Sequence, residues 1–154
     1  MSFFKVKQYF NDLGLSHRVK EFSQSSATVE EAAMAIGCVP ERIAKTMSFL
    51  LGNEAILIVT AGDAKIDNRK YKDYFHEKAK MISGELVEGY IGHAPGGVCP
   101  FAINQSVKVF LDVSLKRFEI VYPAAGSGNS AVELSINELE TYSNYSDWID
   151  VCKF

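Results

Sequence analysis

The sequence has 154 residues, of which 47% are hydrophobic and 23% charged, and its formal net charge is −3. These values predict one folded domain, residues 1–154, and they do not favour a general nucleic-acid binder. The longest apolar runs, such as Ala55 to Ala61, are far too short to span a bilayer, so we expect no membrane partner.

The first half of the chain predicts two helices, a short strand and a hairpin. Apolar residues at helical spacing precede Gly14, which stops the first helix, and the capping box Thr28 to Glu31 opens a second helix that Gly37 ends. Gly52-Asn53 between two apolar runs indicates a β-hairpin. In chain order, we expect these elements at 3–13 (helix), 17–22 (strand), 28–36 (helix), 45–51 and 54–61 (hairpin strands).

The second half predicts three helices, three strands and two loops. Ser83 has the form of an N-cap and leads through a short helix into the glycine- and proline-rich loop 92–101. Ala125 to Ser130 is expected to be a second, flexible polar loop, and Ser135 or Asn137 is expected to cap a last helix. The remaining elements are expected at 68–78 (helix), 107–113, 118–122 and 132–136 (strands) and 148–154 (a packed tail). This order predicts an α+β (mixed α/β) domain with a curved mixed sheet flanked by helices.

Charge is unevenly distributed along the chain. Residues 65–80 contain six Lys or Arg against three Asp or Glu, whereas residues 133–150 are acidic. A locally basic edge on an acidic protein could meet a phosphate backbone at one place only. A solvated helix face is the more common explanation of such a run, and both interpretations stay open.

The loop 92–101 reads Gly92-His93-Ala94-Pro95-Gly96-Gly97-Val98-Cys99-Pro100-Phe101. Glycine leaves the backbone bare, and proline fixes φ so that the loop is rigid. Such a loop offers amide N–H groups to an anion or to a carbonyl oxygen, as in an oxyanion hole. It also suits a tight turn between a helix and a strand, and the loop chemistry alone does not decide between them.

Three side chains are candidates for chemistry. Lys45 stands at the entrance of an apolar strand, where it either guards a sheet edge or holds a phosphate in a cleft. His93 is either a general base or, as we favour, a histidine bonded to its own loop. Cys99 would be the nucleophile of a cysteine hydrolase acting on small esters or amides, but no histidine at a recognisable family spacing accompanies it.

The absence of known motifs bears on the cofactors and the cellular compartment that we expect. No paired Cys/His spacing, P-loop or dinucleotide fingerprint is present, so we expect no metal and no cofactor. The three cysteines are widely separated, and the first residues lack the features of a signal peptide, which together favour a reducing cytoplasm. A site without a convincing protein base must rely on positioning, on oxyanion stabilisation or on groups of the substrate.

Five short motifs follow one another in a definite order: Thr28-Val29-Glu30-Glu31-Ala32-Ala33, Ile43-Ala44-Lys45-Thr46, Gly96-Gly97-Val98-Cys99-Pro100-Phe101, Ala125-Gly126 and Val132-Glu133-Leu134. In this order and separation they resemble the YbaK/EbsC family, the free-standing relatives of the editing domain inserted in bacterial prolyl-tRNA synthetases. The resemblance runs from about Phe3 to about Tyr142.

The resemblance implies a mixed-sheet domain that hydrolyses mischarged aminoacyl-tRNA of the tRNA(Pro) type. Lys45 is then expected near the phosphate of the terminal adenosine. Backbone amides of Gly96, Gly97 and Val98, in the loop that Pro100 closes, would face the scissile ester carbonyl. Catalysis in the family depends on substrate groups, chiefly a terminal ribose hydroxyl, which fits the missing protein base.

The aminoacyl pocket is expected to contain six residues: Phe22, His93, Cys99, Gly126, Ser127 and Asn129. Two departures from the family pattern stand out. Cys99 replaces a common serine or threonine, and Asn129 and Ala131 replace a glycine and an aspartate of the later loop. The changes at Asn129 and Ala131 motivate a second hypothesis, a non-catalytic module of the same fold that binds tRNA or a synthetase. The expected partner is the acceptor end of aminoacyl-tRNA, and a synthetase stays open as another.

Overall fold

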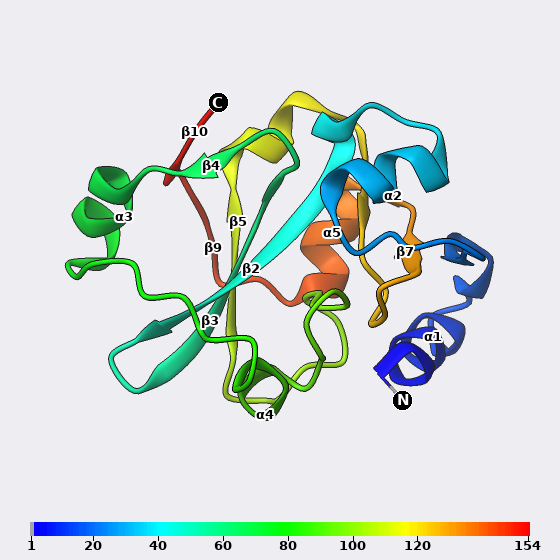
Figure 1. The fold of residues 1–154 in the computed structure, drawn as a ribbon, viewed down its shortest axis with the longest axis horizontal. Helices are drawn as coiled ribbons and strands as arrows, with labels where there is room; N and C mark the ends of the chain where they lie inside the picture. The colour runs from blue at the N-terminus through cyan, green and yellow to red at the C-terminus, as the bar shows by residue number, and fades with distance from the viewer. Residues whose placement is uncertain (1) are drawn as a thin grey trace.

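A curved, mixed sheet of six strands forms the centre of the protein, and the computed structural model describes residues 2–154 (Figure 1). The strand order is β8-β6-β2-β3-β5-β9. β2 pairs antiparallel with β3 and parallel with β6, and β3, β5 and β9 run parallel to one another. In chain order these strands are β2 (Ile43–Leu51), β3 (Glu54–Ala61), β5 (Lys108–Asp112), β6 (Ile120–Pro123), β8 (Leu134–Ser135) and β9 (Asp147–Ile149). The predicted mixed α/β class with a curved sheet is confirmed.

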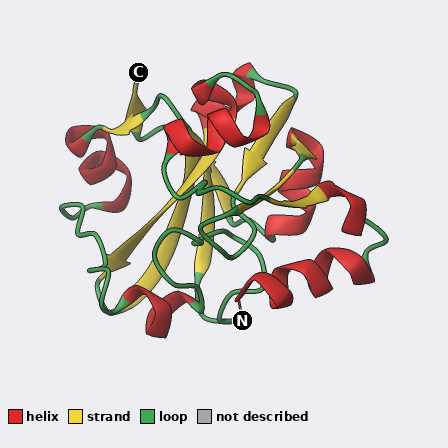
Figure 2. Cartoon of the chain, turned by 45° about the vertical axis from the view of Figure 1, so that its right-hand side comes forward, coloured by secondary structure: helices red, strands yellow, loops and turns green. Residues whose placement is uncertain are grey.

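Helices and two small strand pairs surround this sheet (Figure 2). The helices are α1 (Ser2–Asp12), α2 (Val29–Ile36), α3 (Asn68–Phe75), α4 (Val87–Ile91) and α5 (Ile136–Ser143). Short 3₁₀ turns occupy 16–18, 40–42 and 113–117. The small pairs are β1 (Val19–Glu21) with β7 (Ser130–Val132) and β4 (Lys65–Ile66) with β10 (Cys152–Lys153), both antiparallel. None of the helices within residues 2–154 has both the length and the apolar character needed to cross a membrane.

Local signals place the first half of the chain as expected. Thr28 Oγ1 accepts the N–H of Glu31 at 3.1 Å, and Glu31 Oε1 accepts the N–H of Thr28 at 3.3 Å, so the capping box of α2 is complete. Gly37 ends α2 with φ 85°, a left-handed conformation that glycine adopts without strain. The hairpin of β2 and β3 turns at Gly52-Asn53.

Four predicted elements differ from the structure. The helix over 68–78 ends at Phe75, because His76 takes a left-handed φ of 64°. Ser83 does not cap α4 with its side chain; its carbonyl oxygen instead accepts N–H groups in a backbone turn before Val87. The strand predicted at 17–22 is only three residues long. The strand predicted at 132–136 is split, because 130–132 pair with β1 while 134–135 pair with β6.

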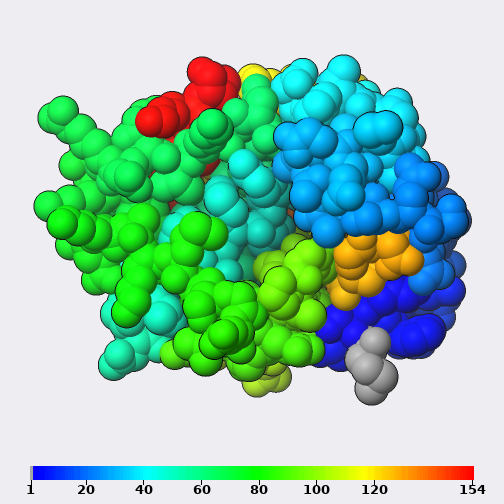
Figure 3. Space-filling model, in the orientation of Figure 1, coloured from blue at the N-terminus to red at the C-terminus, as the bar shows by residue number. Residues whose placement is uncertain are grey.

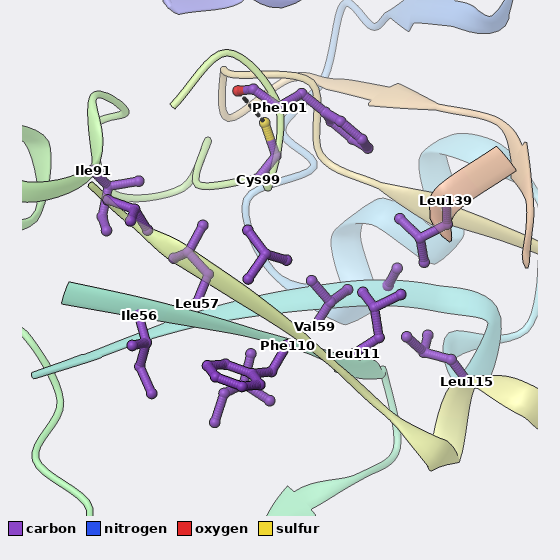
Figure 4. Close-up of a cluster of buried hydrophobic side chains, with 14 of the residues drawn as sticks. Ile56, Leu57, Val59, Ile91, Cys99, Phe101, Phe110, Leu111, Leu115 and Leu139 are labelled. Carbon is purple, nitrogen blue, oxygen red and sulfur yellow. Dashed lines mark hydrogen bonds between the residues drawn. The ribbon is translucent and has the colours of Figure 1, made fainter. Parts of the chain in front are cut away.

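The core lies on both faces of β3, whose residues 55–61 are all buried. A strand buried on both faces reads as a continuous apolar run, as this one does. Figure 4 shows Ile56, Leu57 and Val59 packed with residues of β5 and with Cys99 and Phe101 from the loop 92–101. The glycine-rich loop is therefore anchored in the core at its end.

Candidate functional site

A pocket of about 170 Å³ opens where α2, the start of β2 and the loop 92–101 meet. Figure 3 shows the blue residues of α2 facing the yellow-green residues of that loop across the hollow. The volume lies below the roughly 300–1,000 Å³ of pockets that hold drug-sized ligands, so a small acyl group fits better than a whole nucleotide. The wall comprises Ser26, Ala27, Thr28, Val29, Ala32, Ile43, Ala44, Lys45, Thr46, Gly96, Val98, Tyr122, Ala124, Ser130 and Ala131.

Strand β2 reaches the pocket because its outer side is only partly paired. β6 pairs with β2 at Ile43 and Ala44, and the segment 80–82 bonds to β2 again at Ser48 and Leu50. Between these two contacts lie residues 45–47. Lys45 and Thr46, at the beginning of this interval, form part of the pocket wall.

Lys45 is half-buried, and its ammonium donates a 2.7 Å hydrogen bond to the carbonyl oxygen of Ala64. Burial lowers the pKa of Lys45 from its ordinary value, and the nearby positive charge of Lys65 acts in the same direction. Although β2 lies between β3 and β6, its pairing with β6 ends at Ala44, so Lys45 lies on a stretch of strand that, among the described residues, is unpaired on its outer side. The edge-guard interpretation and the phosphate-binding interpretation both stay open. The ammonium keeps two further donors for an anion at the pocket.

The loop 92–101 contributes Gly96 and Val98 to the pocket, and Gly97 lies behind them. The N–H of Gly97 is already donated to the carbonyl oxygen of Ala94 at 3.1 Å. Over residues 2–154, no hydrogen bond starts from the N–H of Gly96 or Val98. Of the three amides expected to act as donors, Gly96 and Val98 therefore have a free N–H, and Gly97 does not.

Gly97 instead makes a close backbone contact with the second glycine loop. A Cβ on Gly97 would lie 2.6 Å from the carbonyl carbon of Gly126 and 2.6 Å from the nitrogen of Ser127. Gly126 has φ 90°, and a Cβ there would lie 2.7 Å from the carbonyl oxygen of Ser2. The two loops and the start of α1 thus pack through bare backbone. Ala125 and Gly126 are buried, so the second loop, which is predicted to be flexible and polar, packs closely at its beginning.

The structure does not bring Phe22, Gly126, Ser127 or Asn129 to the pocket wall. Asn129 joins its loop to β1: its carbonyl oxygen accepts the N–H of Phe22 at 2.7 Å, and its Nδ2 donates to the oxygen of Phe22 at 3.0 Å. Ser127 Oγ lies 2.6 Å from Ser130 Oγ and donates to Asn129 Oδ1 at 2.9 Å. These residues support the wall, which Ser130 and Ala131 form directly.

His93 and Cys99 are fully buried beneath the loop. His93 Nε2 lies 2.7 Å from the carbonyl oxygen of Phe101, which can only accept, so Nε2 carries the ring proton. Cys99 Sγ lies 3.5 Å from the same Nε2 and points to Phe101 (Figure 4). Nε2 therefore cannot take the thiol proton, and burial raises the pKa of Cys99 to about 12. This pair does not form a nucleophile and base, and it lies off the pocket wall.

Pro100, which closes the loop, lies on the other side of it. It is buried and borders a separate hollow with Tyr9 and Val107. It fixes the loop rather than contacting the pocket. Within residues 2–154, no three His, Cys, Asp or Glu side chains converge as metal ligands would.

Several pocket residues were not singled out from the sequence, notably Ser26, Thr46, Tyr122 and Ser130. Thr46 Oγ1 is buried and has no hydrogen-bond partner among the described residues. Its position directly after Lys45 is the one signal that could have identified it. Tyr122 and Ser130 reach the pocket only through non-local strand pairing, which no local pattern reveals.

The chain is similar to proteins of known sequence and structure over most of its length. Residues 23–142 match the model of a family described as the aminoacyl-tRNA editing domain. The uncharacterized protein YwhH of Bacillus subtilis (strain 168) is 51% identical over 154 residues, covering 99% of this chain and 98% of that protein.

Two further similarities point toward prolyl-tRNA synthetases. A proline–tRNA ligase of Bacillus licheniformis is 28% identical over 124 residues, which are 77% of this chain but 21% of the ligase. A solved structure described as a candidate trans-editing enzyme for prolyl tRNA synthetase superposes with a TM-score of 0.88 at 25% identity, covering 99% of this chain and 98% of that one.

Proposed function

Because this chain belongs to the aminoacyl-tRNA editing domain family, we propose that it is a trans-acting deacylase that hydrolyses the ester of mischarged aminoacyl-tRNA. The observation that carries the proposal is the convergence of Lys45 with the free amides of Gly96 and Val98 on one small pocket. The similarity to an editing enzyme for prolyl tRNA synthetase, together with that to proline–tRNA ligases, supports substrates of the tRNA(Pro) type.

The loop amides supply the electrostatic part of the reaction. With the ester carbonyl oxygen facing the N–H groups of Gly96 and Val98, negative charge that develops on that oxygen meets two fixed donors. One such donor typically lowers a barrier by about 3 kcal/mol. Water attacks the ester carbon, the bond to the ribose oxygen breaks, and the products are the free amino acid and the uncharged tRNA.

The proton transfers fall to the substrate, because the described pocket wall contains no histidine, cysteine or carboxylate. The free hydroxyl of the terminal ribose accepts a proton from the attacking water and passes its own proton to the departing ribose oxygen. Such assistance needs accurate positioning more than a strong base. The rigid loop and the buried pair of His93 and Cys99 beneath it supply that positioning.

Lys45 holds the terminal phosphate of the tRNA. Its ammonium is partly desolvated, which is why its pKa is lowered. A phosphate at the pocket mouth gives this ammonium a partner of opposite charge. The hydrogen bond to Ala64 fixes the direction of the side chain before the substrate arrives. Lys45 thereby sets where the ester lies relative to Gly96 and Val98.

A non-catalytic binding module of the same fold is the second candidate. Ala131 favours it, because this residue lies in the pocket wall where the family pattern has an aspartate. The side chain of Asn129, another departure, donates a hydrogen bond to the carbonyl oxygen of Phe22 and is not part of the pocket wall.

A deacylation screen separates the two candidates. The purified chain is incubated with tRNAs charged with alanine, serine, threonine or cysteine, and release of the amino acid is followed against hydrolysis without protein. We expect release from at least one of them, with the tRNA itself intact. Binding of these tRNAs without release of any amino acid would support the module and contradict the deacylase.

A further inference from the structure

A group of exposed cations between residues 65 and 80 is not used by the proposed reaction. Five of the six Lys and Arg side chains between residues 65 and 80 form no salt bridge within residues 2–154: Lys65, Arg69, Lys72, Lys78 and Lys80. The sixth, Lys70, pairs with Asp150 at 3.2 Å. We call the five the cationic surface.

The acidic residues of the same segment are mostly engaged elsewhere. Asp67 caps α3 and accepts the N–H groups of Arg69 at 3.0 Å and Lys70 at 3.1 Å. Glu77 Oε1 accepts the N–H of Gly52 at 2.8 Å. Asp73 is the acid of this segment without a partner in the described part of the chain. These carboxylates keep their charge, and the segment is positive because its six Lys and Arg outnumber its three Asp and Glu, although the whole chain has a net charge of −3.

Three residues of the cationic surface, Arg69, Lys72 and Lys78, border a hollow. Asn68, Arg69, Lys72, Lys78 and Ala79 enclose a hollow of about 520 Å³. Arg69 and Lys72 are three residues apart on α3 and therefore share one face of the helix. Tyr71, on another face of α3, is fully buried against Phe49 and Phe75. A fixed positive hollow of this kind attracts anions.

Both ends of the cationic surface are joined to the strand that carries Lys45. Lys65 directly follows Ala64, whose carbonyl oxygen accepts a hydrogen bond from the ammonium of Lys45. At the other end, the carbonyl oxygen of Lys80 accepts the N–H of Leu50 in β2. Figures 1 and 3 show α3 and the chain that follows it on the face that also displays α2 and the pocket.

We propose that the cationic surface binds the sugar–phosphate backbone of the acceptor stem while the 3′ end occupies the pocket. This inference rests on the proposed function and names the part of the tRNA that lies outside the pocket. Lys and Arg contacts to phosphates position a nucleic acid without reading its sequence. The surface thus contributes to the affinity for tRNA, and the pocket determines which amino acid is removed.

The test measures binding of an uncharged hairpin RNA with an acceptor stem and a CCA end, as a function of salt concentration. Arg69→Ala/Lys72→Ala removes two cations of the surface, and Lys7→Ala/Lys108→Ala removes two exposed cations elsewhere and is the matched control. We expect the first variant to lose about 1.5 units of the slope of log affinity against log salt, and roughly tenfold in affinity at about 0.1 M salt. The control should match the wild type, and the thermal unfolding of both variants should be unchanged.

Two results would overturn the inference. One is equal slopes and affinities for Arg69→Ala/Lys72→Ala and the wild type. The other is equally tight binding of a polyglutamate peptide of matched charge, which would make the surface a general anion site. Hairpin binding needs no turnover, so an inactive chain that binds through this surface would count against the deacylase alone.

A kinetic readout separates the surface from the pocket. With a charged tRNA that the wild type hydrolyses, Arg69→Ala/Lys72→Ala should raise KM and leave kcat unchanged. With the same amino acid on a CCA trinucleotide, which has no stem, the variant and the wild type should have equal kcat/KM. A loss on the trinucleotide as large as on the whole tRNA would contradict a role in binding the stem.

Discussion

At the scale of single residues, the site depends on two glycines that touch through their backbones. Gly97 and Gly126 come from loops almost 30 positions apart, and there is no room between them for a side chain on Gly97. This contact holds the loop 92–101 at a fixed height over the sheet. Gly96 and Val98, on either side of Gly97, line the pocket.

A methyl group at this contact should separate the two loops. In Gly97→Ala, the new Cβ would overlap backbone atoms of Gly126 and Ser127 that cannot move aside as a side chain tip does. We expect a loss of about 1–3 kcal/mol in the free energy of unfolding. Displacing the neighbouring donor should also slow deacylation about 100-fold or more.

Gly128→Ala is the control for this prediction. A Cβ at Gly128 would have Ala27 Cβ at 3.6 Å, an ordinary contact, so stability and rate should stay near those of the wild type. Denaturant unfolding and single-turnover hydrolysis measure both effects. Similar behaviour of the two alanine variants would show that the close contact at Gly97 has no special role.

His93 and Cys99 illustrate why residue type alone is a poor guide to chemistry. Six positions apart in a glycine-rich loop, they suggested a base and a nucleophile. Their environment assigns them to the core, because burial lowers the pKa of His93 and raises the pKa of Cys99 to about 12. Both groups are therefore held in their neutral forms, which suits packing rather than acid–base catalysis.

At the scale of elements, α2 connects stability with the pocket. The turn before this helix and its first residues, Ala27 to Val29, form one wall. The capping box of Thr28 and Glu31 fixes that turn, and Glu31 Oε1 also accepts the hydroxyl of Ser25 at 3.1 Å. The N-terminus of α2 therefore shapes the pocket, and its capping box also provides hydrogen-bond partners for backbone N–H groups.

Two capping boxes in the same chain allow a matched comparison. Thr28 caps α2 at the pocket, whereas Ser135 caps α5 with Glu138 in the same way and away from the pocket. Thr28→Ala and Ser135→Ala should each cost about 1 kcal/mol of stability, since each removes one capping hydrogen bond. Only Thr28→Ala should raise KM for a charged tRNA. Equal changes in KM for the two variants would argue against α2 as a wall of the site.

The elements with local signals were predictable, and those set by distant contacts were not. The box at Thr28, the turn at Gly52-Asn53 and the last helix after Ser135 follow from short-range patterns. The break at Glu133 does not, because it arises where one strand leaves β1 and the next joins β6. Lys45, Gly96 and Val98 were expected at the site because their motifs resemble those of the editing family, whereas Ser130 and Tyr122 reach the pocket through non-local pairing and were not expected there.

At the scale of the whole molecule, the pocket lies where strand β2 has no pairing partner on its outer side within residues 2–154. β6 covers the outer side of β2 at its beginning, and the segment 80–82 covers it near its end. The interval between them exposes Lys45 and Thr46 to a pocket closed by α2 on one side and by the glycine-rich loop on another. The segment that carries the cationic surface bonds to β2 at both of its ends, through Ala64 to Lys45 and through Lys80 to Leu50.

The measurement that tests the central claim most directly is the single-turnover rate of Lys45→Ala on the charged tRNA that the wild type hydrolyses. We expect a loss on the order of 100-fold, since Lys45 positions the ester, with thermal unfolding within a few degrees of the wild type. Lys108→Ala, an exposed lysine far from the pocket wall, should keep the full rate. A folded Lys45→Ala protein that hydrolyses the ester as fast as the wild type would contradict the assignment of this pocket as the deacylation site.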